Sequence, residues 1–242
     1  MQPHPLFTAH YRSTEEKERF LRTIFDQSAP HYESIVNWGF FGSGDRYRRQ
    51  ALLRGGLKKG MRVLDVATGT GPTARAAVHI VGDLRNIVGV DPSLGMMQES
   101  RKRLLVTCVQ GVADHLPLRD QQFDFLVMGF ALRHVERLEG AFSEYLRVLK
   151  PGGHVLILDI TVPRNSFARK LSALYFRDVL PWLTQRFTRS GNATALMRYH
   201  WETLDQMVEP QWVAEALQAA GFRDVQRRRV LGVFSEYEGV RP

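Results

Sequence analysis

The stretch Val63-Leu-Asp-Val-Ala-Thr-Gly-Thr-Gly71-Pro72 carries the strongest structural signal in the chain. Its first four residues form a short, largely apolar run typical of a buried strand, and Gly69 and Gly71 predict a tight turn that lets a ligand approach the backbone. Pro72 suits the first position of a following helix, where its missing N–H needs no partner. The stretch therefore predicts a strand, a glycine turn and a helix in succession.

The same alternation continues toward the C-terminus. Short β-prone runs recur at 87–90, 105–110, 123–128 and 154–160, with helical segments at 94–104 and 138–149 between them. The Lys150-Pro-Gly-Gly153 segment ends the last of these helices. This spacing predicts an α/β, Rossmann-like fold with a doubly wound, mostly parallel sheet.

Other regions flank this core on both sides. Helical spacing at 15–25 and 48–57 predicts an N-terminal helical flank. A helix ending at Gly221 and two strands separated by Gly232 complete the core at its C-terminal end. The predicted parts are the flank at 1–60, the cofactor-binding core at 61–163, an inserted helical lid at 164–209, and a C-terminal helix with the last strands at 210–242.

The amino-acid composition limits which kinds of protein this chain can be. The 242 residues, 44% apolar and 24% charged, are typical of one globular α/β domain. The formal net charge of +8 favours anionic partners. The single cysteine, Cys108, cannot close an intrachain disulfide, and its apolar neighbours predict a buried strand thiol in a reducing compartment. The absence of a signal-peptide pattern or a long apolar run predicts a cytoplasmic protein.

Two acidic residues accompany the glycine turn. Asp65 ends the first strand, and Asp91 ends the second, about 20 residues beyond the glycines, where a carboxylate can accept both ribose hydroxyls of an adenosine. Asp65 is suited to a positively charged α-amino group and repels a pyrophosphate. A structural alternative is that the glycines only shape the turn and Asp91 caps a helix. A nicotinamide-dependent dehydrogenase is a second alternative, since Gly69-x-Gly71-x-x-Ala74 also satisfies the dinucleotide fingerprint.

The glycine turn and its two acidic residues are part of a larger set of motifs that match a known family. The chain resembles the ubiquinone/menaquinone biosynthesis C-methyltransferases, within the class I S-adenosylmethionine-dependent methyltransferases, over nearly its whole length. The matching elements are Phe25-Asp26 with Ala29 and Tyr32, Asp65-x-Ala67-x-Gly69-Thr70-Gly71, His115-Leu-Pro-Leu118, Phe123-Asp124, Leu132-Arg133, Arg147-Val-Leu-Lys-Pro-Gly-Gly153, Arg198-Tyr199 with Glu202, and Ala220-Gly221-Phe222.

The resemblance implies seven strands with the last one antiparallel, a helical lid over the acceptor, and S-adenosyl-L-methionine as cofactor. It implies that Met96 packs against the adenine and that the Ala113 backbone bonds it. The residues implied to bind the cofactor are Asp65, Ala67, Gly69, Thr70, Gly71, Asp91, Met96, Val112, Ala113 and Gly129.

Three positions depart from the family pattern. Val112 replaces the usual Asp or Asn that bonds the adenine amino group, and Asp114 is the candidate to compensate. His134 replaces the Asn of an Arg-Asn pair, and Gly129 replaces a Ser near the methionine end of the cofactor. Because the changes at positions 134 and 129 fall at the expected reaction site, the acceptor need not be the respiratory quinone precursor.

Methyl transfer needs few catalytic groups, because the sulfonium methyl is already activated and alignment supplies most of the acceleration. For carbon methylation of a phenol or hydroquinone, ionising the hydroxyl activates the ring. Arg133 can stabilise the oxyanion, His134 can act as base, and Tyr32 can position a proton or a water. The structural alternatives are an ion pair for Arg133, a helix cap for His134 and an interface aromatic for Tyr32.

The lid is rich in aromatic and basic residues. Tyr175, Tyr199 and Trp201 are predicted to contact a flat acceptor, together with Trp182, Phe187 and His200. For any single one of them, a place in an ordinary helical core is the stronger expectation. The lid's cations suit a peripheral contact with an anionic membrane; they are Arg164, Arg169, Lys170, Arg177, Arg186 and Arg189.

The sequence thus favours a methyltransferase acting on a small aromatic or quinone-like acceptor, at carbon. An O- or N-methyltransferase of a natural-product pathway is the main alternative, and a scaffold that binds without turnover is another. Arg227-Arg228-Arg229 lacks the interleaved aromatics of a nucleic-acid site, so no nucleic-acid partner is predicted. No metal is predicted, and a homodimer stays an open alternative.

Overall fold

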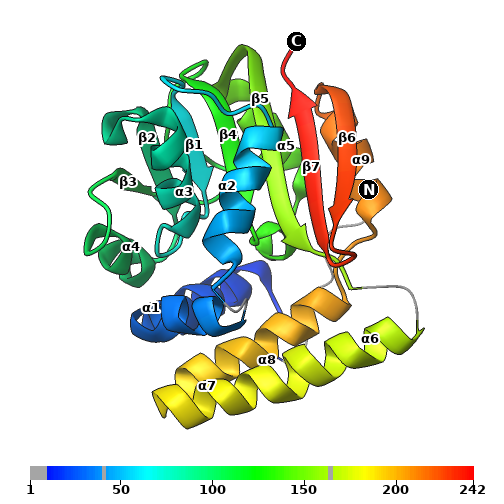
Figure 1. Ribbon diagram of the computed structural model, residues 1–242. Coiled ribbons are helices and arrows are strands. Elements are labelled where there is room, and N and C mark those ends of the chain that lie inside the picture. Colours follow the sequence, from blue (N-terminus) through cyan, green and yellow to red (C-terminus); the bar gives the residue numbers. More distant parts are fainter. Residues whose placement is uncertain (1–9, 40–41, 163–165) are drawn as a thin grey trace.

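The computed structural model describes residues 10–39, 42–162 and 166–242, which build one seven-stranded sheet with helices on both faces (Figure 1). The strand order is β3-β2-β1-β4-β5-β7-β6, and β7 runs antiparallel to both its neighbours. The predicted fold, including the antiparallel last strand, is therefore confirmed. The strands are β1 Val63–Val66, β2 Ile87–Asp91, β3 Thr107–Gln110, β4 Phe123–Gly129, β5 Leu149–Ile160, β6 Arg223–Val230 and β7 Phe234–Val240.

The centre of the sheet lies between β1 and β4. Val63 of β1 pairs with Ile87 of β2 on one side and with Phe125 of β4 on the other. All four β1 residues are buried because helices cover both faces of the sheet. Chain order reverses between β1 and β4, and in open α/β sheets ligands bind at the carboxyl ends of the strands at such a point.

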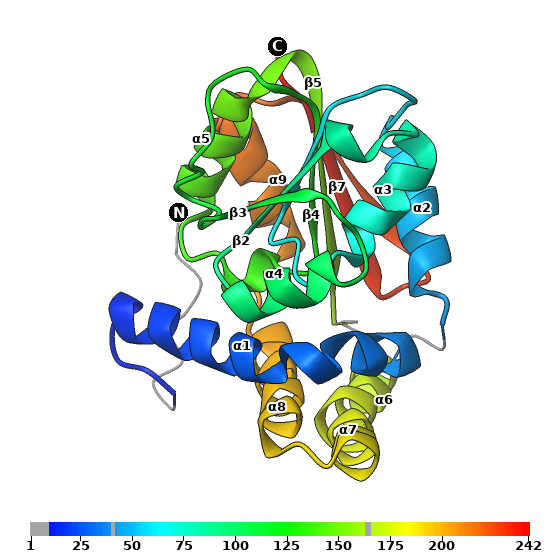
Figure 2. The same cartoon turned by 90° about the vertical axis from the view of Figure 1, so that its left-hand side faces the viewer.

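Two helical layers cover the sheet, one on each face (Figure 2). One apolar cluster joins the central strands to α5 and α9, and a second joins them to α2 and α3. Glycines at the ends of helices allow the sharp turns back to the strands; Gly82, for example, follows α3 with a φ of 87°. The covering helices are α2 Gly44–Arg54, α3 Pro72–Val81, α4 Leu94–Arg101, α5 Leu138–Val148 and α9 Pro210–Ala219.

A third layer lies across the carboxyl ends of the strands. Helix α1 (Thr14–Gly39) runs between the sheet and a lid, and α8 packs against it (Figures 1 and 2). Ile24 and Ile35 of α1 share an apolar cluster with Leu180 and Leu196 of the lid. The lid consists of α6 Ser166–Ala173, a π-helical segment Leu174–Val179, α7 Leu180–Thr188 and α8 Gly191–Asp205.

Three local predictions need correction. The helix predicted at 15–25 extends to Gly39, because Ser28, Ala29 and Ile35 continue its buried face past Pro30. The sequence also predicts a mostly helical segment over 167–187 that is broken at Pro181. Pro181 does not break the helix, because it lies in the first turn of α7, where a proline N–H is not needed, and the wide π turn precedes it. Cys108 lies on the edge strand β3 and is only half-buried.

None of the described helices combines the length and the apolar content that crossing a membrane requires.

Candidate active site

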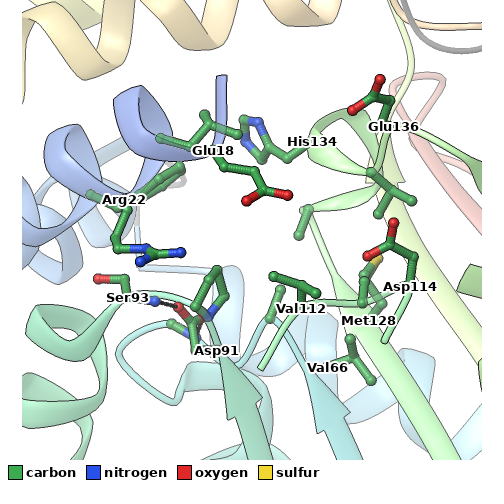
Figure 3. Close-up of a pocket in the computed structure, with 18 of the residues that line it drawn as sticks. Glu18, Arg22, Val66, Asp91, Ser93, Val112, Asp114, Met128, His134 and Glu136 are labelled. Atoms are coloured by element: carbon green, nitrogen blue, oxygen red, sulfur yellow. Dashed lines mark hydrogen bonds between the residues drawn. The ribbon is translucent and has the colours of Figure 1, made fainter. Parts of the chain in front are cut away.

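Two connected cavities lie at the carboxyl ends of β1, β2 and β4. The larger one has a volume of about 550 Å³ and is bounded by strand ends on one side and α1 on the other (Figure 3). The smaller one, about 90 Å³, lies between the glycine turn and the lid; we refer to it as the inner chamber. The residues that line both are Tyr32, Ala67, Gly69, Gly129, Phe130 and Arg133.

The glycine turn forms the floor of both cavities. Gly69 and Gly71 adopt φ values of 57° and 84°, which favour glycine. A Cβ at Gly71 would approach the Ser100 hydroxyl to 2.6 Å, whereas a Cβ at Gly69 would meet nothing within 4 Å. The Thr70 hydroxyl is buried on the chamber wall and has no hydrogen-bond partner among the described residues. The turn therefore leaves open space and an unused donor where a ligand fits.

Asp91 joins the end of β2 to this turn. Its two carboxylate oxygens accept hydrogen bonds from the Gly69 and Ser93 amides, each at 2.8 Å. The side chain lines the larger cavity although the residue is only 6% exposed. Burial raises the pKa of Asp91 to about 6, against the effect of the two backbone bonds. Each oxygen keeps a second lone pair for a ligand hydroxyl.

Asp65 lies behind the cavity wall. One carboxylate oxygen accepts the Thr68 hydroxyl at 2.8 Å, and the other has no hydrogen-bond partner among the described residues. Burial raises the pKa of Asp65 to about 7. Thr68, Ala67 and Gly69 line the inner chamber, but Asp65 lines neither cavity. Thr68, which lines the chamber and donates its hydroxyl to Asp65, therefore lies between this carboxylate and the cavity.

The far end of the larger cavity is apolar with an acidic rim. Met96, Val112 and Ala113 line it, as the resemblance implies for an adenine site, and Met96 is almost completely buried. Asp114 lines the same end and lies beside Val112 (Figure 3). Its carboxylate is 4.0 Å from the Arg137 guanidinium. An acidic group is therefore present although position 112 itself is apolar.

The glycine at position 129 has a structural explanation. A Cβ at Gly129 would lie 2.7 Å from the Thr73 hydroxyl oxygen, so the serine usual in the family would collide with Thr73. Thr73 is buried at the start of α3 and lines the inner chamber. Thr73 of α3 therefore places a hydroxyl close to the position where a serine at 129 would place its own.

Two of the three predicted catalytic residues line both cavities, and the third lines only the larger one. Arg133 is buried, donates to the Phe130 carbonyl at 2.6 Å and lies 3.3 Å from Asp159. Its Nε has no hydrogen-bond partner among the described residues. Tyr32 lines both cavities, and burial raises the pKa of its hydroxyl. His134 lines only the larger cavity, between the rings of Tyr199 and Phe25.

The predicted acceptor-binding residues of the lid lie elsewhere. Tyr175 donates to the Gly39 carbonyl at 2.7 Å, which ties the lid to α1, and the hydroxyls of Tyr199 and Tyr11 are 3.1 Å apart. Neither residue, nor Trp201, lines either cavity. Trp182 and Phe187 are 65% and 58% exposed and line neither cavity, and the Phe187 ring contacts Trp38 of α1 with centroids 4.5 Å apart. The prediction that these two enclose an acceptor was therefore wrong.

Other side chains line the inner chamber, and the sequence reasoning missed them. Arg48 of α2 is 3% exposed, and its Nε has no hydrogen-bond partner in the described part of the chain. An arginine on the helix face that also carries Ala51 and Leu52 was the available signal. The lid contributes Phe176, Leu180, Met197 and Leu204, and also His200, which the sequence had already suggested among the lid residues.

Comparisons with known sequences agree with this geometry. The family model described as the ubiE/COQ5 methyltransferase family matches residues 13–241. The chain is 32% identical to the ubiquinone/menaquinone biosynthesis C-methyltransferase UbiE of Geobacter sulfurreducens, over 95% of this chain and 91% of the relative. It is 31% identical to a demethylmenaquinone methyltransferase of Symbiobacterium thermophilum, over 87% of each chain.

Solved structures share the fold. A methyltransferase of Thermotoga maritima, described as a possible histamine N-methyltransferase, superposes with a TM-score of 0.64 at 22% identity, covering 92% of this chain and all of that one. Phosphoethanolamine N-methyltransferase 2 of Haemonchus contortus, solved with S-adenosyl-L-methionine, gives 0.67 at 18% identity, covering 91% of this chain and 60% of that one.

Ligand binding at Asp91 is expected to depend on pH. Ribose hydroxyls donate to the ionised carboxylate, so S-adenosylhomocysteine affinity should fall by up to about tenfold per pH unit as the pH drops below 6, where Asp91 takes up a proton. Calorimetric titration between pH 5 and 8 measures this. Asp91→Asn should bind S-adenosylhomocysteine more weakly and lose this part of the pH dependence. Asp65→Asn should retain it. If affinity changed with pH equally in wild type and Asp91→Asn, the assignment would be contradicted.

Proposed function

Since this chain belongs to the ubiE/COQ5 methyltransferase family, it is an S-adenosylmethionine-dependent methyltransferase, and we propose that it methylates a ring carbon of a quinone-like hydroquinone. One observation supports the proposal most strongly. A cavity suited to a nucleoside opens, through shared residues, into an inner chamber that combines apolar lid side chains with the buried Arg133 guanidinium. A flat apolar ring with an ionisable hydroxyl matches that combination.

The residues present fit the cofactor. Asp91 would accept the ribose hydroxyls, Met96 would pack on the adenine, and Asp114 would accept the adenine amino group in place of a residue at position 112. The Thr70 hydroxyl and the Arg48 Nε are buried donors without a hydrogen-bond partner among the described residues. Both could donate to the carboxylate of the cofactor's amino acid part. The cofactor supplies an electrophilic methyl group on a positively charged sulfur.

The reaction end is arranged around the developing oxyanion of the acceptor. The Arg133 guanidinium already contacts Asp159, so it is held in a fixed position and keeps Nε for a second partner. A fixed cation beside a hydroxyl stabilises the phenolate and raises electron density on the ring. Tyr32 lies between the two cavities, where its hydroxyl would orient the acceptor relative to the methyl group.

The first test is binding and turnover. Calorimetric titration should show micromolar binding of S-adenosylmethionine and S-adenosylhomocysteine, lost in Asp91→Ala, and no binding of NAD. Incubation with demethylated naphthohydroquinones should then give a product methylated at carbon, identified by mass spectrometry and NMR. A product methylated only at oxygen or nitrogen would support the natural-product alternative. Binding of NAD alone would overturn the assignment. Cofactor binding without turnover of any acceptor would indicate a protein that binds the cofactor but does not catalyse methylation.

If the Thr73 hydroxyl takes the place of a serine hydroxyl at position 129, then moving the hydroxyl back to position 129 should preserve binding. Thr73→Ala removes the hydroxyl and should weaken S-adenosylhomocysteine binding about three- to tenfold, the worth of one hydrogen bond. Gly129→Ser alone should also weaken binding, because its Cβ meets the Thr73 hydroxyl. The double variant Thr73→Ala/Gly129→Ser should recover most of the affinity, measured by calorimetry. If its loss of binding free energy equals the sum of the two single losses, the hydroxyl at 129 does not replace the one at 73.

The outer lid supports a proposed membrane contact. Helices α6 and α7 and the π-helical segment between them lie in the lid, away from the sheet (Figure 1), and the exposed apolar side chains on these elements are Phe167, Leu171, Leu174, Trp182 and Phe187. Arg186 and Arg189 are exposed beside them and form no ion pair within the described part of the chain. Arg164 falls outside the described residues. Apolar side chains mixed with free cations suit an anionic bilayer, from which a lipid-soluble quinone would reach the lid.

Vesicle sedimentation tests this contact. The protein should pellet with vesicles containing phosphatidylglycerol but not with phosphatidylcholine alone, because each basic residue near an anionic surface contributes about 1 kcal/mol. Phe167→Ser/Leu171→Ser and Arg186→Glu/Arg189→Glu should each reduce the bound fraction several-fold. Leu105→Ser, which removes an equally exposed leucine far from the lid in sequence, is the matched control; equal binding by all variants would exclude the lid.

A further inference from the structure

His200 of α8 lies where a proton acceptor would be needed. It lines the inner chamber, and its Nε2 is buried without a hydrogen-bond partner among the described residues. Its ring lies edge-on to the Tyr32 ring, with centroids 6.2 Å apart, and 6.1 Å from the Phe25 ring. The rest of the chamber wall that the lid provides is apolar. His200 is therefore the one imidazole that the described lid places in the chamber.

The charged and titratable groups around His200 come from three elements. Tyr32 faces it from α1, Arg133 and His134 from the 3₁₀ turn Leu132–His134, and Tyr199 precedes it on α8. Burial lowers the pKa of His200 well below its usual value, and Arg133 adds to this effect. The ring is consequently neutral at neutral pH, with a lone pair on one nitrogen.

We propose that His200 is the general base that removes the hydroxyl proton of the acceptor, an inference that rests on the methyl transfer proposed above. His134, the base suggested by sequence, is less well placed. It lines the larger cavity only, and its ring is stacked on Tyr199 with centroids 5.9 Å apart. His200 shares the chamber with Arg133 and Tyr32, so that base, cation and orienting hydroxyl surround one space.

The proposed step is balanced in protons and electrons. The acceptor O–H bond breaks, its proton moves to Nε2 of His200, and the oxyanion faces Arg133. The ring carbon then bonds to the methyl carbon while the methyl–sulfur bond breaks and its electron pair stays on sulfur. As the ring carbon loses its own proton to solvent, the oxygen recovers the proton from His200. One proton is released for each methyl group transferred.

Arg133 has two opposing effects on this transfer, and the second compensates for the first. Its charge disfavours the imidazolium, which makes His200 a weak base in the free protein. The same charge stabilises the phenolate, which makes the acceptor hydroxyl more acidic. Once the proton has moved, the oxyanion lies between the two cations, so the proton transfer creates favourable ion pairs with both of them.

The experiment compares two acceptors that differ in hydroxyl acidity. 2-Alkyl-1,4-naphthohydroquinone is neutral at neutral pH and needs a base, whereas 2-hydroxy-1,4-naphthoquinone is already ionised and does not. His200→Gln should lower kcat by about 100-fold or more on the first acceptor and less than about threefold on the second. S-adenosylhomocysteine affinity should stay unchanged, which separates failure of this proposal from failure of the cofactor assignment. The exposed His79→Gln is the control.

A second variant guards against a structural effect. His200→Gly should be inactive on the neutral hydroquinone and should regain at least tenfold activity with added imidazole, which a misfolded lid could not do. Three results would each overturn the proposal. His200→Gln could lose the same activity on both acceptors, imidazole could fail to rescue His200→Gly, or the acceptor-dependent loss could appear in His134→Gln and not in His200→Gln. If the wild type does not use the ionised acceptor, the imidazole rescue decides.

Discussion

The hydrogen bond from the Gly69 amide to the Asp91 carboxylate is the constraint on which the site depends. It spans the ends of β1 and β2 at 2.8 Å and holds the glycine turn against the neighbouring strand. Because Gly69 and Gly71 occupy the left-handed region, this turn brings backbone, and not side chains, to the cavity surface. Parallel pairing fixes where both strands end, so the sheet determines the position of the turn and of Asp91 together.

Buried charge is arranged to suit a ligand that carries both signs. Asp65 and Asp91 have raised pKa values because burial penalises their charged forms, while the buried Arg48 and Arg133 each keep an Nε without a partner in the described chain. A zwitterionic ligand with ribose hydroxyls would satisfy such groups, because it offers partners of both signs. The apolar remainder of the wall increases the strength of each of these interactions.

The sequence predicted what local patterns determine. The strand, turn and helix at 63–81, the alternating core and Asp91 were visible because each depends on residues adjacent in sequence or on parallel-strand spacing. The acceptor side was not predictable in the same way. Tyr175, Tyr199 and Trp201 were selected as aromatics, but which face of a lid helix meets α1 depends on tertiary packing. Arg48 and Thr73 were missed because their roles depend on partners far away in sequence, such as Gly129.

Helix α1 couples the two halves of the site. It forms one wall of the larger cavity and, through Tyr32, part of the inner chamber. The lid is attached to the same helix by the Tyr175 bond to Gly39 and by the shared apolar cluster. The two parts of the site therefore share one structural element, so a displacement of α1 would change the walls of both cavities together.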